Sequence, residues 1–539
     1  MAKPKAEVTL SRQLGPVAMM FTGLSIIGSG WLFAALYTAQ LAGPAGILSW
    51  VIGGVVTLAI ALVYAELGGM LPVGGALARI PYFSFGPLGG FMAGWLCWAA
   101  FVATAPLEVI AVLDYATNYL PWLSEIEDGE RRLTFEGVLV AIAMLALFTG
   151  INLAGVKYFA RANTTITFWK LLVPVVAAIL LIAYGFRWEN LTEFGGFAPY
   201  GATGVMSAVS SGGIMFAFYG FRSVVDMAGE ARNPRRDVPL SIIGTVVFCI
   251  IFYIALQIAF IGAVPVDQLS NGWAGITETA PGGPFAAFAA ILGLQWLAIL
   301  LYADAIVSPA GTGLTFMASA ARINYSMAKA DQVPSFFGRL NRFRVPGLSL
   351  GFNFLIGIVV VLPLPGWNQL VEFISTSAVL SFAFGPVALM VLRLHVPNRS
   401  RPFRIPIAYT FTALAFILVT FIVYWTGWET NWKIMVVAAV GIVIFATVRR
   451  LKHGPIEPLH LRASAWIWPY YGGLAIMSYG GNYGGGLGLI PNGVDLLILA
   501  VFSLSVFRYA IWLRLDRTIV ERLLETSRAE IESAPGAAQ

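Results

Sequence analysis

The chain has 539 residues, of which 58% are hydrophobic and only 11% charged, and its formal net charge is +6. This composition excludes an ordinary soluble protein, because apolar runs of membrane-spanning length recur from one end of the chain to the other. Basic loops between these runs account for the positive charge, which therefore requires no nucleic-acid partner. The sequence predicts an all-α integral membrane protein.

Fourteen apolar segments are long enough to cross a bilayer as helices. No loop between them is long enough to form a second soluble domain. The predicted spans are residues 14–41, 46–71, 87–117, 134–154, 163–186, 203–229, 238–263, 284–323, 347–363, 366–392, 406–427, 432–449, 463–480 and 492–514.

Lysine and arginine are distributed unevenly between alternate loops. If the N-terminus is cytoplasmic, the inner segments carry most of the basic residues. The outer loops then carry only Arg131, Arg132, Arg187 and Lys433. Because cytoplasmic loops are enriched in lysine and arginine, both termini are predicted to be cytoplasmic. We expect a multi-pass protein of the plasma (inner) membrane of a bacterium or archaeon.

Residues that support catalysis or metal binding are scarce. His395, His453 and His460 lie in predicted cytoplasmic segments without a cluster of cysteines or carboxylates at metal-ligand spacing. Cys97 and Cys249 lie within spans, where packing is their expected role. No nucleophile elbow, Walker loop or zinc-protease motif is present. The sequence predicts no enzyme, no catalytic residue, no metal and no cofactor.

The first span carries Gly28, Ser29 and Gly30 in its middle, where three small or flexible residues allow a helix to break. The amides exposed by a break would form the N-terminus of a half-helix, which binds a carboxylate through free N–H groups and the positive dipole end. The carbonyl groups before it, up to Ile27, would face a cation or an ammonium group. The alternative interpretation is a small-residue notch for packing against another helix.

Three charged residues of the next spans have structural or functional interpretations. Glu66, near the cytoplasmic end of the second span, suits a loop-anchoring carboxylate, with a turn after it. Glu108, at mid-depth in the third span, is either a proton site or a hydrogen-bonded structural group. Lys170, in the fifth span, either extends to the membrane interface or points inward. An inward lysine would alternate between ammonium and amine and would take the place of a sodium ion.

Residues 207–239 contain a second interrupted helix, with three glycines in its apolar part. Arg222 and Asp226 then lie at membrane depth, either paired with each other at i and i+4 or lining a site. This helix opens the second group of five spans, as the Gly28–Gly30 helix opens the first. Broken helices at corresponding positions of two halves indicate an inverted-repeat transporter with its site between them.

The eighth span places Asp304 at mid-depth, and Ser308-Pro309 is expected to break the helix and free carbonyl groups. These polar groups would complete a cation site or receive the Lys170 ammonium. Alternatively, Asp304 is paired with Arg222 or hydrogen-bonded in a static core. The polar tail after Arg517 is predicted to form a short cytoplasmic helix that frays.

Several of these motifs resemble one known family. Gly28-Ser29-Gly30 is similar to the substrate-binding break of the amino acid–polyamine–organocation (APC) permeases. VYAELGGMLPVGG resembles their second helix, FAFYGF…GEARNPRRDVP their sixth helix and the following turn, and RINYSMAKADQVP the loop after their eighth. Bacterial aspartate–proton symporters are the most similar members, on GSGWLFA, LVYAELG, GGIMFA, AIVSPAGTG, RPF, VYWTGW and GLGLIPNGVDL, and this similarity extends into the last four spans.

The resemblance implies a LeuT-like fold of five plus five helices in an inverted repeat, with discontinuous first and sixth helices. It implies that the amides at Gly28 to Gly30 hold an α-carboxylate and that backbone carbonyls near Ile27 and Phe218 hold the α-amino group. Lys170 matches the lysine that replaces sodium in proton-coupled members. The site residues expected on this basis are Ile27, Gly28, Ser29, Gly30, Phe218, Tyr219, Gly220 and Arg222 for substrate, and Lys170, Glu108, Asp304 and Ser308 for proton coupling.

The expected organisation is a ten-helix transporter core over 1–400, two helices over 401–455, two additional helices over 456–516 and a cytoplasmic tail over 517–539. The expected function is uptake of an acidic amino acid, such as aspartate, with a proton, by a monomer or homodimer in contact with lipid. The alternatives are transport or exchange of a cationic or neutral amino acid or a polyamine, and a non-transporting amino acid sensor on the same scaffold.

Overall fold

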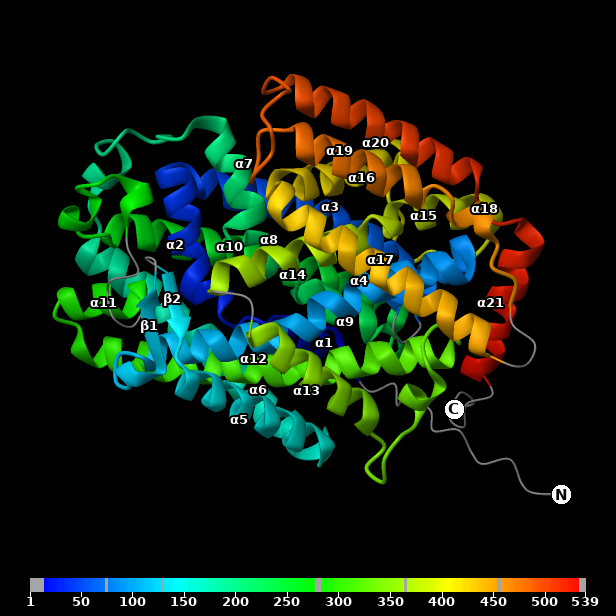
Figure 1. The fold of residues 1–539 in the computed structure, drawn as a ribbon, viewed down its shortest axis with the longest axis horizontal. Coiled ribbons are helices and arrows are strands. Elements are labelled where there is room, and N and C mark those ends of the chain that lie inside the picture. The colour runs from blue at the N-terminus through cyan, green and yellow to red at the C-terminus, as the bar shows by residue number, and fades with distance from the viewer. Residues whose placement is uncertain are drawn as a thin grey trace.

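The computed structural model describes residues 14–72, 76–127, 130–154, 156–276, 283–362, 366–452 and 457–532. In these segments the protein is almost entirely helical (Figure 1). The strands β1 (Ser124–Glu127) and β2 (Glu130–Leu133) form a two-stranded antiparallel sheet, in which Ser124 lies opposite Leu133.

The helices of the first half end before residue 264. They are α1 (Pro16–Leu24), α2 (Gly30–Ala42), α3 (Gly46–Met70), α4 (Ala76–Ala116), α5 (Phe135–Leu153), α6 (Val156–Gly185), α7 (Gly201–Ser211), α8 (Ile214–Ala217), α9 (Gly220–Asp226) and α10 (Pro234–Ala263).

The second half contains the remaining helices. They are α11 (Pro284–Ile291), α12 (Gln295–Lys329), α13 (Gly347–Val361), α14 (Trp367–Phe382), α15 (Phe384–His395), α16 (Ala408–Thr426), α17 (Trp428–Leu451), α18 (Leu461–Ser464), α19 (Ile467–Gly480), α20 (Val494–Trp512) and α21 (Arg517–Glu532).

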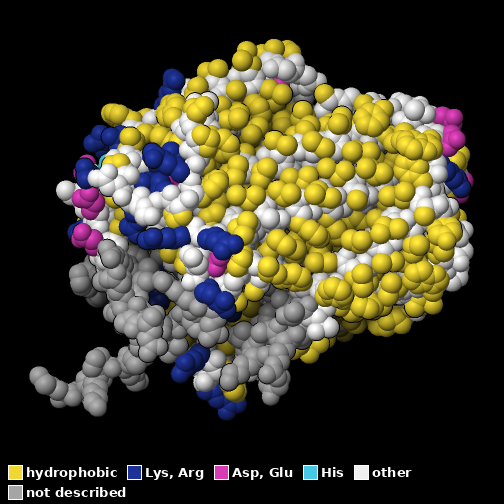
Figure 2. Space-filling view, turned by 180° about the vertical axis from the view of Figure 1, so that it is seen from behind, with side chains coloured by type: hydrophobic (Ala, Val, Ile, Leu, Met, Phe, Trp, Pro, Cys, Tyr) yellow, Lys and Arg dark blue, Asp and Glu magenta, His cyan; other side chains and the backbone are white. Residues whose placement is uncertain are grey.

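The protein is an all-α membrane protein, as predicted. Ten helical stretches of the described residues are long and apolar enough to cross a membrane. Each of the fourteen predicted segments contains at least one helix, but the number of fourteen crossings remains a prediction. A broad hydrophobic surface covers most of the face in Figure 2, and lysine and arginine side chains gather toward one end. This surface is the one that faces lipid.

Helix α4 is the central element of the fold. Its most apolar 18-residue window is 100% buried, whereas that of α17 is only 22% buried. Around α4 pack α12, α14, α13, α15 and α17. A kink at Gly86 (φ 77°) divides α4, and a left-handed backbone of this kind favours glycine. The α4 segment after this kink carries both Cys97 and Glu108 through the middle of the protein.

Both predicted interruptions of membrane helices are present. The first lies between α1 and α2, at residues 25–29, and the second separates α7, α8 and α9. Gly213, before α8, has a φ of 85°, which a residue with a Cβ atom rarely adopts. The break expected at Ser308-Pro309 is absent, and that prediction was wrong. Helix α12 continues through Pro309, and the interruption of this region lies earlier, between α11 and α12.

Glu66 anchors the loop after α15, as the sequence predicts. It is 0% exposed, and both its oxygens accept hydrogen bonds from Arg393, at 2.8 and 2.5 Å. The amide of Ile405 donates to the same carboxylate at 2.8 Å. Glu66 thus joins α3 to the end of α15 and to the segment that leads into α16.

Replacing Glu66 with glutamine is expected to lower the melting temperature of the detergent-solubilised protein by several degrees. Removing one partner of a buried ion pair leaves the other charge uncompensated, which costs about 3–5 kcal/mol. Glu521→Gln is the control, because Glu521 pairs with Arg517 at 2.8 Å where both side chains are exposed. Equal melting temperatures for the two variants would contradict the anchoring role.

Candidate functional site

The break in the first helix lies opposite Glu108. Helix α1 ends at Leu24, and α2 begins at Gly30 without a side-chain cap from Ser29. The amide of Ser29 instead donates to Glu108 Oε2 at 2.9 Å. Glu108 is fully buried on α4, and within the described residues its Oε1 has no hydrogen-bond partner. A carboxylate therefore occupies the N-terminus of the half-helix, the position where an anion is favoured.

Lys170 contacts the same break. Its Nζ donates to the Ser25 carbonyl at 3.0 Å and to Thr312 Oγ1 at 2.6 Å. Thr312 in turn donates to the Ile27 carbonyl at 3.2 Å. Lys170 is 0% exposed, so the interpretation in which it extends to the membrane interface is wrong. The ammonium satisfies carbonyl groups that the interrupted helix leaves without intrahelical partners.

Asp304 and Ser308, about two turns and one turn before Thr312 on α12, form a separate pair. Ser308 Oγ donates to Asp304 Oδ1 at 2.8 Å, and Trp31 Nε1 donates to Oδ2 at 3.1 Å. On α12 the Lys170 ammonium donates to Thr312, and not to Asp304 or Ser308. Asp304 is thus hydrogen-bonded to α2 at the edge of the site, and its part in proton coupling stays a prediction.

The two interrupted helices face each other. A Cβ atom at Gly30 would lie 3.4 Å from the Phe216 ring and 3.6 Å from Ala217 Cα, so the start of α2 meets α8. A Cβ atom at Gly220 would lie 2.5 Å from the Gly23 carbonyl, because α9 packs against the α1 backbone. The geometry thus brings the breaks of both halves to one place.

The neighbouring aromatic residues of the sixth segment point in different directions. Tyr219 donates from its hydroxyl to the Ile374 carbonyl on α14, at 2.6 Å. The Phe218 ring packs on Trp50 and Tyr253, toward α3 and α10. The Phe218 side chain is therefore occupied by its packing on α3 and α10. Its backbone carbonyl remains a candidate for substrate contact, as the resemblance implies.

Trp367, at the start of α14, also contacts the break. Its Nε1 donates to Ser29 Oγ at 2.8 Å, and its ring stacks on Phe33 and Tyr37 with centroids 5.2 and 5.3 Å away. Neither Trp367 nor Thr312 is among the site residues predicted from the sequence. Thr312 lies one turn after Ser308, and this i+4 spacing places both residues on the same face of α12, so Thr312 could have been predicted from the sequence. Trp367 gave none, because 338 residues separate it from Ser29.

Arg222 is fully buried one turn after the second break, with its guanidinium 4.0 Å from the Phe101 ring centroid and 5.6 Å from that of Phe382. Its Nη2 lies against Cys97 Sγ. In the described part of the chain, its Nε and Nη1 have no hydrogen-bond partner. Among the described residues Arg222 forms no direct ion pair with Asp226 or Asp304, but the charge of Asp226, one turn further on, still interacts with it electrostatically. The aromatic faces of Phe101 and Phe382 stabilise this cation as well.

A buried site between two interrupted membrane helices is that of a secondary transporter. The sequence model of the amino acid permease family matches residues 15–445, and the chain belongs to this family. It is an amino acid transporter of the membrane and not an enzyme.

Three relatives from Bacillus subtilis illustrate the similarity. The glutamate/serine transporter AimA is 36% identical over 511 residues, which cover 93% of this chain and 94% of that protein. An aspartate-proton symporter is 37% identical over 502 residues, covering 92% of this chain and 95% of that protein. The branched-chain amino acid permease BcaP is 26% identical over 470 residues, covering 85% and 97%.

Proposed function

We propose that this transporter imports an acidic amino acid, such as aspartate, together with a proton. The observation that carries the proposal is the pair of ionisable side chains at the first break, with Glu108 on the Ser29 amide and Lys170 on the Ser25 carbonyl. Two relatives that cover nearly the whole chain support the proposal, since one is named for glutamate and serine and the other for aspartate and proton symport.

Glu108 would couple proton binding to substrate binding. The α-carboxylate of a substrate needs the amides at Gly28 to Gly30, and Glu108 already accepts from Ser29 in the absence of substrate. Two carboxylates in one site repel each other, so that binding the substrate favours the protonated form of Glu108. Proton and amino acid would then enter the site together.

Lys170 would take the place of a coupling sodium ion. Its ammonium bonds the Ser25 carbonyl and, through Thr312, supports the Ile27 carbonyl. Loss of the proton would remove this cationic support from α1 and allow the half-helix to move. The alternation of Lys170 between ammonium and amine would thus drive the change that exposes the substrate site to one side of the membrane and then to the other.

Arg222 would bind the side-chain carboxylate of the substrate. Phe101, against which it rests, lies seven residues before Glu108 on α4, or about 10 Å along the helix. The free Nε and Nη1 could form a bidentate pair with a carboxylate, which is stronger than the contact with an aromatic ring. This residue would distinguish aspartate and glutamate from neutral amino acids.

The test is uptake of labelled L-aspartate into proteoliposomes with and without an inward proton gradient. We expect aspartate to accumulate only with the proton gradient. Unlabelled glutamate should inhibit this uptake by competition, whereas arginine and putrescine should not. Arg222→Gln should weaken competition by aspartate by about 10- to 100-fold, since a hydrogen bond to a charged group contributes about 1.5–3 kcal/mol. Competition by a neutral amino acid should change little. Accumulation of arginine or putrescine instead would overturn the assignment of an acidic substrate. Accumulation of aspartate without a proton gradient would overturn the proton coupling.

A further inference from the structure

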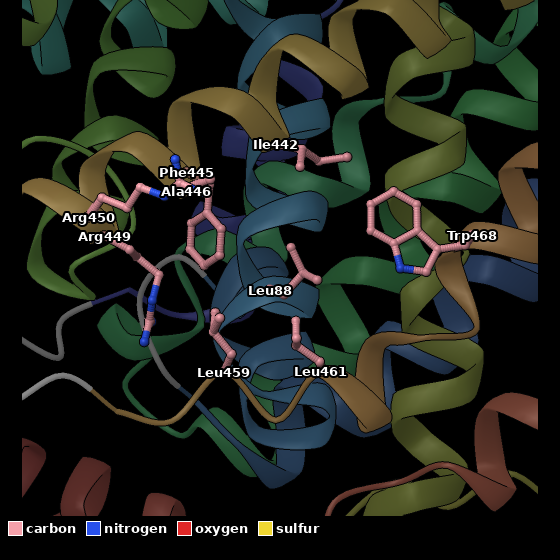
Figure 3. A pocket seen from close by; sticks show the side chains of 9 residues that line it. All are labelled: Leu88, Ile442, Phe445, Ala446, Arg449, Arg450, Leu459, Leu461 and Trp468. Carbon is pink, nitrogen blue, oxygen red and sulfur yellow. The ribbon is translucent and has the colours of Figure 1, made fainter.

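A groove on the lipid-facing surface is distinct from the substrate site. It has a volume of about 380 Å³ and lies where α4, α17 and α19 meet (Figure 3). Its apolar lining consists of Leu88, Ile442, Phe445, Leu459, Leu461 and Trp468. A volume above about 300 Å³ is sufficient for a small organic ligand or part of a larger one.

The groove opens toward the bilayer. Leu461 and Trp468 on one of its walls are 58% and 51% exposed, while Leu88 and Phe445 at its base are 5% and 3% exposed. Helix α17, which forms the other wall, is among the least buried spans. A lipid-exposed concave surface of this kind takes up hydrocarbon chains, because they are its ordinary solvent.

The end of the groove is basic. Arg449 and Arg450 occupy the last turn of α17, and both line the groove. Arg449 is held in place by a hydrogen bond from Nη2 to the Glu457 carbonyl at 2.6 Å. The nearby Glu457 carboxylate is paired with Arg522 at 2.5 Å, so its charge, which also acts on Arg449, is shared between two arginines. Within the described residues, Arg450 is exposed and has no ion pair.

We propose that this groove is a binding site for an anionic glycerophospholipid. An acyl chain would lie along Leu88, Phe445 and Trp468, and the phosphate would lie between Arg449 and Arg450. Basic pockets between membrane helices at the cytoplasmic side recognise anionic head groups in this way. The predicted orientation of the chain places these arginines on the cytoplasmic side.

The site depends on the C-terminal part of the chain. The match to the amino acid permease family ends at residue 445, whereas Leu459, Leu461 and Trp468 follow it. Ser464, at the end of α18, donates to the Phe85 carbonyl at 2.9 Å, next to the kink of α4. A lipid in the groove would therefore contact the helix that carries Glu108, at a distance from the substrate.

The experiment measures the melting temperature of the purified full-length protein in a neutral detergent with added phosphatidylglycerol or phosphatidylcholine of identical acyl chains. A ligand that binds only the folded state raises the melting temperature with its concentration. We expect phosphatidylglycerol to act at concentrations about tenfold lower than phosphatidylcholine. Glycerol phosphate, which has the head-group charge without acyl chains, should not act at these concentrations.

Arg450→Gln removes a side chain that makes no hydrogen bond in the described structure, so the variant should fold. It should weaken the phosphatidylglycerol effect about fivefold, and Arg449→Gln with Arg450→Gln about 30-fold. The control is the exposed pair Arg235 and Arg236 at the start of α10, and its double glutamine variant should respond like the unmodified protein. Equal responses to both phospholipids would mean ordinary annular lipid and overturn the proposal. An unchanged phosphatidylglycerol effect in Arg450→Gln and in the Arg449→Gln, Arg450→Gln double variant would also overturn it.

Discussion

Lys170→Ala is expected to abolish proton-driven accumulation of the substrate. A gradient of about two pH units drives roughly 100-fold accumulation if one proton enters with each substrate, because each unit corresponds to a factor of ten. In the variant, the ratio of internal to external substrate should fall to about one. The physical reason is that Nζ bonds the Ser25 carbonyl and Thr312 at the break, where no other cation is available among the described residues.

The measurement is uptake of labelled L-aspartate into proteoliposomes at several imposed gradients, together with exchange at equal pH. Exchange is expected to persist, since the amides that hold the α-carboxylate remain. Lys329→Ala is the matched control, because Lys329 lies exposed at the end of α12 and should leave accumulation unchanged. Full gradient-driven accumulation by Lys170→Ala would remove this lysine from the coupling mechanism.

Gly28→Ala is expected to weaken substrate binding strongly. A Cβ atom at Gly28 would lie 2.5 Å from Glu108 Oε1 and 2.7 Å from Thr312 Oγ1, which is too close for real atoms. Forcing an extra methyl group into a packed site costs about 1–3 kcal/mol, equivalent to a loss of roughly 5- to 150-fold in affinity. The measurement is aspartate binding by isothermal titration, with the melting temperature recorded for each variant.

Two other glycines serve as comparisons for this variant. Gly150 on α5 has no heavy atom within 4 Å of its Cβ position, so Gly150→Ala should bind like the unmodified protein. At Gly30 the nearest atom is 3.4 Å away, so alanine should be tolerated and only a bulky residue should block the site. Unchanged binding by a folded Gly28→Ala variant would argue against the break as the carboxylate site.

Local sequence was sufficient to identify the interrupted helices. Gly28, Ser29 and Gly30 lower the cost of a break in one helix, and Gly212, Gly213 and Gly220 do so in the other. Proline was a less reliable signal. Pro309 removes one backbone donor, but α12 continues because the surrounding helices hold its two halves in line.

The partners of the charged groups were beyond the reach of the sequence. Glu66, Glu108 and Lys170 are all buried, yet Glu66 anchors a loop while the other two hold the first break. Their partners lie 327, 79 and 145 residues away in the chain. Arg222 is a clear example, because the i+4 spacing pointed only to Asp226, whereas the fold also places the rings of Phe101 and Phe382 against the guanidinium.

The sequence by itself determined the class of the protein. Hydrocarbon requires every backbone group to be satisfied internally, so apolar segments of sufficient length specify membrane helices, and small flexible residues mark where they open. Only the tertiary structure decided which polar side chains meet there. Thr312 and Trp367 entered the site, and Asp304 remained at its edge, because long-range packing sets the distances between groups that are far apart in the chain.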